Sequence, residues 1–150
     1  MICGTVAVGS VMELATALTF AAEHRHGVLI TLKRDGRPQS SNVVYAVDGP
    51  LVLVSVTDDR AKTRNLRRDP RVSFHVNAPD FWSYAVLEGT AALSEVAAEP
   101  GDETCRRLAE IYETVSGEPH PDWDEFFAAM IEARRLVLSI RAERAYGMVR

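Results

Sequence analysis

The sequence lacks several features that would assign it to a familiar class of protein. It has two cysteines in 150 residues, Cys3 and Cys105, and no CxxC pair. It therefore has neither a disulfide framework nor a zinc or thiol-exchange motif. No apolar run reaches the roughly 20 residues that a membrane-spanning helix needs. We expect a protein of the reducing cytoplasm with no membrane span.

Motifs of nucleophilic and dinucleotide chemistry are missing as well. There is no GxSxG elbow and no GxGxxG at the start of a helix. The four histidines follow no spacing that suits a metal ion: His24, His26, His75 and His120. The sequence therefore predicts no metal site, and it leaves the catalytic residues unknown.

Composition sets the remaining limits. A hydrophobic content of 47% and a charged content of 25% are typical of a folded domain. The net charge of -4 disfavours nucleic acid as a partner, because an acidic body repels phosphates. We expect one domain over residues 12–150 and a disordered extension over 1–11, with translation starting at Met1 or Met12.

The most unusual stretch is the basic segment 60–69, which follows the apolar run 51–56 and ends before Pro70. That order predicts a strand, a turn and a helix of about three turns. The residues that could cap the start of this helix are Thr57, Asp58 and Asp59.

The first turn of this helix carries charges of the wrong sign for the helix dipole. A helix N-terminus favours acidic residues, yet this one holds Arg60 and Lys62. Free N–H groups together with two cations would bind a phosphate or another compact anion. The alternative for Arg64, Arg67, Arg68 and Arg71 is an ordinary solvated face. The sequence therefore predicts an anion site at the start of this helix.

The remaining pattern predicts an α+β fold. Apolar, β-branched and alternating runs indicate six antiparallel strands, at 26–33, 38–47, 51–56, 71–77, 84–95 and 136–146. Gly89 is the expected position of a bulge or bend. Apolar residues at helical spacing indicate helices at 11–24, 101–116 and 122–133, apart from the basic helix. Antiparallel strands with helices in their connections predict a small six-stranded β-barrel with flanking helices.

Two further features fit a planar ligand that carries a phosphate. The strand at 38–47 contains a small polar cluster, Gln39 to Asn42, which suggests that one of its faces lies in a polar cavity. The aromatic cluster Phe81 to Tyr84 at a strand entrance is typical of core packing, or of a flat wall for a ring system. Combined with an anion site, these features suit flavins and their relatives.

Three motifs occur in a characteristic order: DGRPQ followed by SN within 35–42, RAKTRNL at 60–66, and WSYA followed by EG within 82–89. With them the chain resembles the pyridoxamine 5'-phosphate oxidase-like split β-barrel proteins, and most closely their actinobacterial members that bind the deazaflavin coenzyme F420. The resemblance runs from about Met12 to the C-terminus. The end of the chain, 141–150, departs from the vitamin B6 oxidases because it lacks their C-terminal arginine motif.

The resemblance implies a homodimer of barrels of the FMN-binding split-barrel type, with two cofactors in clefts between the subunits. It implies hydride transfer from reduced F420 to an electron-poor small molecule. The alternatives are an FMN-dependent pyridoxamine 5'-phosphate oxidase-like enzyme and a non-enzymatic F420 carrier. Neither nucleic acid nor a membrane is an expected partner.

The resemblance also implies which residues bind the cofactor. Those expected at the phosphate and the ribityl chain are Arg60, Lys62 and Asn65, and Thr63 is a further cofactor contact on the same helix. Those expected at the ring system are Gln39, Ser41 and Asn42. The residues expected from the other subunit are Trp82, Ser83 and Tyr84.

Overall fold

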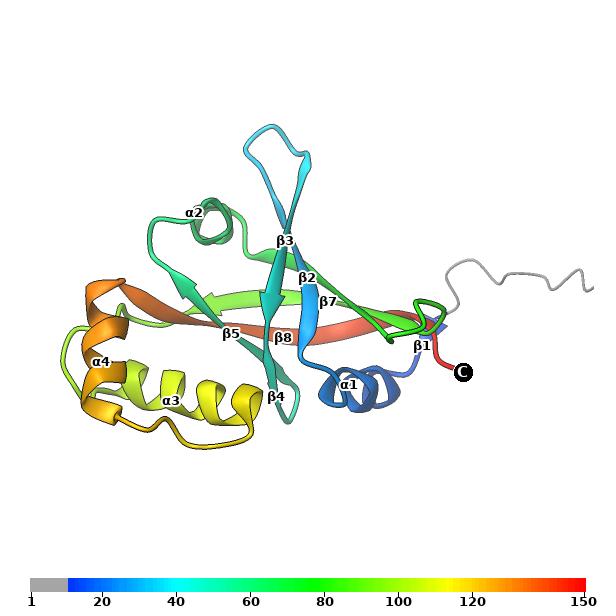
Figure 1. Ribbon diagram of the computed structural model, residues 1–150. Helices are drawn as coiled ribbons and strands as arrows, with labels where there is room; N and C mark the ends of the chain where they lie inside the picture. Colours follow the sequence, from blue (N-terminus) through cyan, green and yellow to red (C-terminus); the bar gives the residue numbers. More distant parts are fainter. Residues whose placement is uncertain (1–10) are drawn as a thin grey trace, which may run out of the picture.

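The computed structural model describes residues 11–150, in which an antiparallel sheet is flanked by helices (Figure 1). The strands are β1 (Val11–Met12), β2 (His26–Leu32), β3 (Pro38–Val44), β4 (Ala46–Asp48), β5 (Leu51–Thr57), β6 (Arg71–Asn77), β7 (Tyr84–Leu93) and β8 (Arg135–Met148). The helices are α1 (Leu14–Ala22), α2 (Ala61–Arg68), α3 (Glu103–Ser116) and α4 (Trp123–Glu132). The expected extension at 1–11 lies outside the described residues except for Val11, which is in β1.

The sheet curls into a barrel because its two end strands belong to one bent segment. The strand order is β3-β2-β6-β7-β8-β5-β4, and β1 pairs with β8. β3 and β4 lie at opposite ends of this order but are separated only by Tyr45 in the chain. The predicted α+β split barrel is confirmed. The six expected strands are present; the one at 38–47 is divided at Tyr45, and β1 is additional.

Tyr45 occupies the bend between β3 and β4 and fixes α1 to the barrel. Its side chain is fully buried, and its hydroxyl donates to the Ala21 carbonyl oxygen at 2.6 Å. Its ring meets Phe74 edge to face, with centroids 4.8 Å apart. Burial raises the pKa of Tyr45 far above its usual range, although the nearby charge of Arg25 opposes this shift. The bend therefore belongs to the core.

Strand alternation produces two apolar clusters. In β8, Leu136 and Leu138 face the barrel interior, whereas Val137 faces outward and packs with α3 and α4. The outer cluster includes Leu108 of α3 and Phe126 of α4. The helical pair therefore covers the outer face of β5 and β8, at one end of the molecule (Figure 1).

The end of α3, the start of α4 and the bulge in β7 lie where the sequence predicted them. Asp122 caps α4 by accepting from the Glu125 N–H at 3.1 Å, and Gly117 ends α3 in the left-handed conformation at φ 82. The register of β7 against β8 shifts between Glu88 and Gly89, which is the predicted bulge.

The predictions for α1 and α2 need correction. The helix expected at 11–24 is shorter, Leu14–Ala22, because residues 11–12 pair with β8 instead. The residue that caps α2 is Arg60, so the prediction of Thr57, Asp58 or Asp59 was wrong. α2 also spans only 8 residues, or about two turns, rather than three. Asp58 cannot serve as the cap because its carboxylate binds Arg67 and Arg134.

Candidate functional site

A basic cleft of about 370 Å³ lies where β3, the end of β5, the start of α2 and the start of β8 meet. Three cationic side chains line it: Arg60, Lys62 and Arg135. The other lining residues come from Asn42–Val44 and Ser55–Thr57, and none of them is acidic. The cleft therefore has the charge expected of an anion site.

The start of α2 adds polar groups at the same place. Arg60 has an extended backbone, φ -72 and ψ 150, and the helix has no side-chain hydrogen bond at its cap. The first N–H groups of a helix have no partner within the helix and favour negative charge. The start of α2 is thus open to an anion on the side where Arg60 and Lys62 lie.

Two buried polar atoms beside the cleft have no hydrogen-bond partner among the described residues, Oγ1 of Thr57 and Nε of Arg135. Both residues line the cleft, and they lie directly opposite each other in the β5–β8 pairing. A buried polar atom without a partner costs free energy, and such atoms are few in native proteins. The wall of the cleft at Thr57 and Arg135 thus holds polar groups that no described residue satisfies.

Among residues 11–150, no carboxylate forms a salt bridge with the three cations of the cleft. The pKa of Lys62 is lowered by burial, and further by the positive charges of Arg60 and Arg135. Asp58 is engaged with Arg134 and Arg67, whose hydrogen bonds hold its pKa below the usual range. The cleft thus keeps an excess of positive charge.

A second cleft of about 440 Å³ shares Asn42, Val43 and Val44 with the first and continues onto β2 and β6. His26, Val28 and Asn77 contribute to it. His75 also lines it and is held from both sides: its Nε2 lies 3.1 Å from Oδ1 of Asn77, and its ring lies 5.4 Å from that of Tyr84. Three valines and four polar side chains line this cleft, a mixture that suits a planar ring with polar edges.

The structure places the predicted ring contacts on different faces of β3. Asn42 lines both clefts. Gln39 and Ser41 point to the other face, because side chains alternate along a strand, and they line neither cleft. Of the three predicted ring contacts, Asn42 is therefore the one that lines the clefts.

The predicted contacts on α2 also divide into two groups. Arg60 and Lys62 reach the basic cleft. Thr63 is buried and donates to the Thr57 carbonyl oxygen at 2.7 Å. Asn65 is buried and donates to Oε1 of Gln39 at 2.9 Å. Thr63 and Asn65 thus join α2 to the barrel within one protomer.

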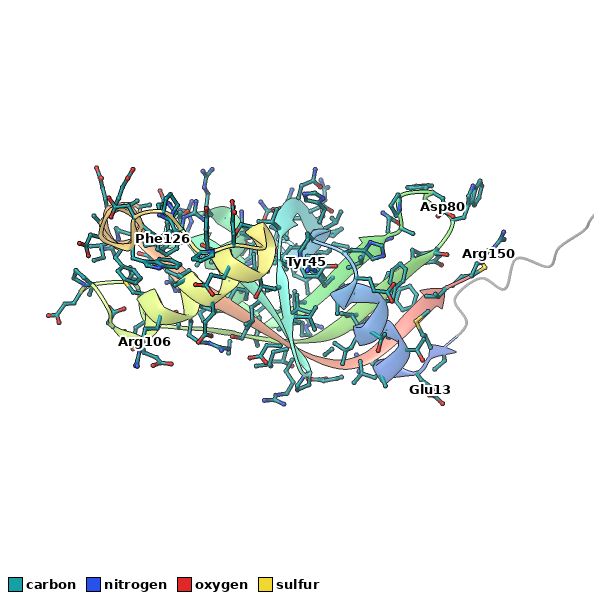
Figure 2. All side chains as sticks on the ribbon, turned by 60° about the horizontal axis from the view of Figure 1, so that its bottom comes forward. Glu13, Tyr45, Asp80, Arg106, Phe126 and Arg150 are labelled. Carbon is teal, nitrogen blue, oxygen red and sulfur yellow. The ribbon has the colours of Figure 1, made fainter. Side chains whose placement is uncertain are left out.

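The aromatic loop before β7 lies away from α2, at the end of the molecule where the chain terminates (Figure 1). Its Trp82 is 65% exposed, and the Trp82 N–H donates to Oδ1 of Asp80 at 3.0 Å. Ser83 accepts from the Arg150 N–H at 3.1 Å, and Asp80 and Arg150 lie at the end opposite Phe126 in Figure 2. Trp82 and Ser83 therefore do not line the basic cleft of their own protomer.

Arg135, Ser55 and Thr57 line the basic cleft but were not predicted from the sequence. Ser55 and Thr57 are polar residues at alternate positions near the end of an apolar strand, which is a weak signal. Arg135 lies 80 residues from Ser55, to which it is hydrogen-bonded. Only the pairing of β5 with β8 brings it to the cleft.

Nearly the whole described sequence matches one known protein family. The profile described as pyridoxamine 5'-phosphate oxidase covers residues 14–148. The chain belongs to the pyridoxamine 5'-phosphate oxidase family. This confirms the resemblance drawn from the three motifs.

The solved structures to which this chain is similar differ in the ligand or function that their names give. A conserved hypothetical protein from Mycobacterium tuberculosis is 27% identical, with 89% of this chain and 82% of that chain covered and a TM-score of 0.71. An F420 reductase is 25% identical, with 81% and 88% covered and a TM-score of 0.58. A heme-binding protein from Mycobacterium smegmatis is 28% identical, with 90% and 53% covered and a TM-score of 0.67. The family thus fixes the fold but not the cofactor.

Residues 11–150 contain no group of three or more His, Cys, Asp or Glu side chains that could hold a metal ion. None of their helices is long and apolar enough to cross a membrane.

Proposed function

We propose that this protein is a coenzyme F420-dependent oxidoreductase that transfers hydride from the reduced deazaflavin to an electron-poor small molecule. The observation that carries the proposal is the basic cleft, with Arg60 and Lys62 at the start of α2 and two unpartnered polar atoms in its wall. The similarity to an F420 reductase supports a deazaflavin as the ligand.

The two clefts suggest how the chain would hold such a cofactor. Arg60 and Lys62 would bind the phosphate, and the ring would extend across Asn42 toward the second cleft and His75. The bound cofactor supplies the hydride chemistry itself. The protein's part is to bind the phosphate and orient the ring. The proton that completes the reduction would come from solvent, so the chain need not supply a catalytic acid.

The proposal includes a homodimer. The exposed loop with Trp82 lies away from the basic cleft of its own protomer. In the proposed dimer, the exposed Trp82 of the partner subunit would cover the cofactor, and its neighbours Ser83 and Tyr84 would hold that loop in place. We infer a cleft completed by two subunits.

The test is a titration of F420 and of FMN into wild type, Lys62→Ala and Arg64→Ala. Arg64 is an exposed cation of the same helix that does not line the cleft, so it is the matched control. Charge-assisted contacts to a partly desolvated phosphate are worth about 1.5 to 3 kcal/mol, so Lys62→Ala should weaken F420 binding about ten- to a hundredfold. Arg64→Ala should change it by less than about fivefold.

The outcomes separate the candidate functions. If FMN binds at micromolar concentration and F420 does not, the alternative of an FMN-dependent oxidase replaces the proposal. If Lys62→Ala binds F420 as tightly as wild type, the phosphate site lies elsewhere.

A carrier protein would need the same binding site as a reductase, so activity must be measured separately. Reduced F420 should be consumed with at least one member of a panel of enones, nitroaromatics and tetrapyrroles. A protein that binds F420 tightly but is inert with the whole panel is a carrier.

A further inference from the structure

We propose that Arg135 is a third anion-binding residue, which forms with Arg60 and Lys62 a site for a ligand segment that carries more than one negative charge. The inference deepens the proposed function and rests on it for the identity of the natural ligand. The site itself can be tested with simple anions.

The geometry of Arg135 leaves part of its guanidinium available to a ligand. Its Nη1 donates to the carbonyl oxygen and to Oγ of Ser55, both at 3.3 Å, which holds the side chain across β5. Its Nε is buried without a partner, as is Oγ1 of Thr57, the residue opposite Arg135 in the β5–β8 pairing. A guanidinium has five N–H donors in a fixed plane, so these bonds do not exhaust it. An anion in the cleft would bind donors of Arg135 that these hydrogen bonds leave open.

The number of charges argues for a polyanionic segment. Arg60, Lys62 and Arg135 line one cleft with no acidic residue among its lining residues. Like charges in a partly buried site repel one another, and a monoanion would neutralise only one of the three. A segment with two or more negative charges matches the site better.

The structure holds Arg135 in place through its neighbour. Arg134 is in the left-handed region at φ 52, which a residue other than glycine adopts only when its surroundings hold it there. Its carbonyl oxygen accepts from the Asp58 N–H at 3.0 Å, and its guanidinium donates to the Asp58 carboxylate at 2.9 Å. Asp58 is therefore a positioning residue, which ties the start of β8 to the turn before α2.

The experiment measures binding of inorganic phosphate and of pyrophosphate to wild type, Arg135→Gln, Arg135→Lys and the control Arg64→Gln. Wild type should bind pyrophosphate more tightly than phosphate. Arg135→Gln should weaken pyrophosphate binding about ten- to a hundredfold and remove the preference. Arg135→Lys should recover part of it, and Arg64→Gln should leave both affinities within about twofold.

Two results would overturn the inference. One is a wild-type protein that binds pyrophosphate no better than phosphate, which requires no variant to fold. The other is an Arg135→Gln variant that keeps the wild-type preference. In support, Asp58→Asn, which retains Arg135, should weaken pyrophosphate binding several-fold.

A parallel titration with F420 distinguishes this inference from the proposed function. If wild type and Arg135→Gln bind F420 equally well, the role of Arg135 is wrong and the proposed function stands. If wild type does not bind F420 but loses its pyrophosphate preference in Arg135→Gln, the polyanion site stands and the deazaflavin is wrong.

Discussion

At the scale of single residues, Asp102 shows how one carboxylate can fix a helix and the loop before it. Its Oδ1 accepts from the Cys105 N–H at 2.7 Å, which caps α3. Its Oδ2 accepts from the N–H groups of Ala98 at 3.0 Å and Glu99 at 3.1 Å. Burial alone would raise the pKa of Asp102, but these backbone hydrogen bonds hold it at about 2.

This pKa predicts a loss of stability in acid. Because the folded pKa lies below the unfolded value of about 3.9, the stabilisation is present above about pH 4 and is lost as the pH falls toward 2. Asp102→Ala should lower the free energy of unfolding by about 1 kcal/mol at pH 7 and flatten its decline below pH 4. Urea unfolding at pH 7 and below pH 4 measures both effects, with Asp124→Ala as the control. Parallel declines in wild type and Asp102→Ala would contradict it.

The residues of the basic cleft were predicted only where the signal was local. Arg60 and Lys62 were found because their charge conflicts with the helix dipole, which is visible in a few consecutive residues. Arg135 could not be found in this way, because its hydrogen bonds to Ser55 join positions 80 residues apart. The sequence of one strand does not by itself determine its register with a distant partner strand.

At the scale of elements, the bulge in β7 depends on the absence of a side chain. A Cβ atom added at Gly89 would lie 1.9 Å from the carbonyl oxygen of Arg141, a backbone atom of β8. No rotation of a side chain can relieve that contact. The neighbouring strands would have to separate at the bulge.

Gly89→Ala should therefore destabilise the barrel by about 1 to 3 kcal/mol, the range for overpacking against a rigid neighbour. Thr90→Ala, at the next position, removes an exposed hydrogen bond to Glu143 and should cost less than about 1 kcal/mol. Equilibrium unfolding in urea compares the two variants. Equal stability for both would mean that β7 and β8 can adjust at no cost.

Local rules predicted some element ends and failed at others for an identifiable reason. The end of α3 and the start of α4 were predicted because Gly117 and Asp122 act within their own helices. The start of α2 was mispredicted because Asp58 binds Arg67 and Arg134 rather than the helix N-terminus. The long-range ion pair with Arg134 thus takes the place of a local helix cap.

At the scale of the whole molecule, exposed apolar side chains occur around one end of the barrel. Val11 is 92% exposed and lies opposite the partly exposed Tyr146 in the β1–β8 pairing. In Figure 1, β1, the loop between β6 and β7 and the end of the chain lie at this end. That loop carries Phe81, which is 72% exposed and strained at φ 73, and Trp82. Exposed apolar groups of this kind mark interaction surfaces.

Wild type should therefore sediment as a dimer at micromolar concentration, and Trp82→Glu should raise the dimer dissociation constant at least about thirtyfold. Ala128→Glu, on the exposed side of α4, is the control and should leave the dimer intact. Analytical ultracentrifugation measures both. A monomeric wild type would rule out a cleft shared between subunits.

The place of β8 in the sheet has a consequence for how the protein is made. β8 is the final strand of the chain, yet it lies between β7 and β5 and also pairs with β1. During translation these three strands emerge before the strand that joins them, at about 5 to 20 residues per second. Until β8 leaves the ribosome, β1 has no partner strand, and β5 and β7 each have one unpaired edge. The barrel can therefore close only after β8 has left the ribosome.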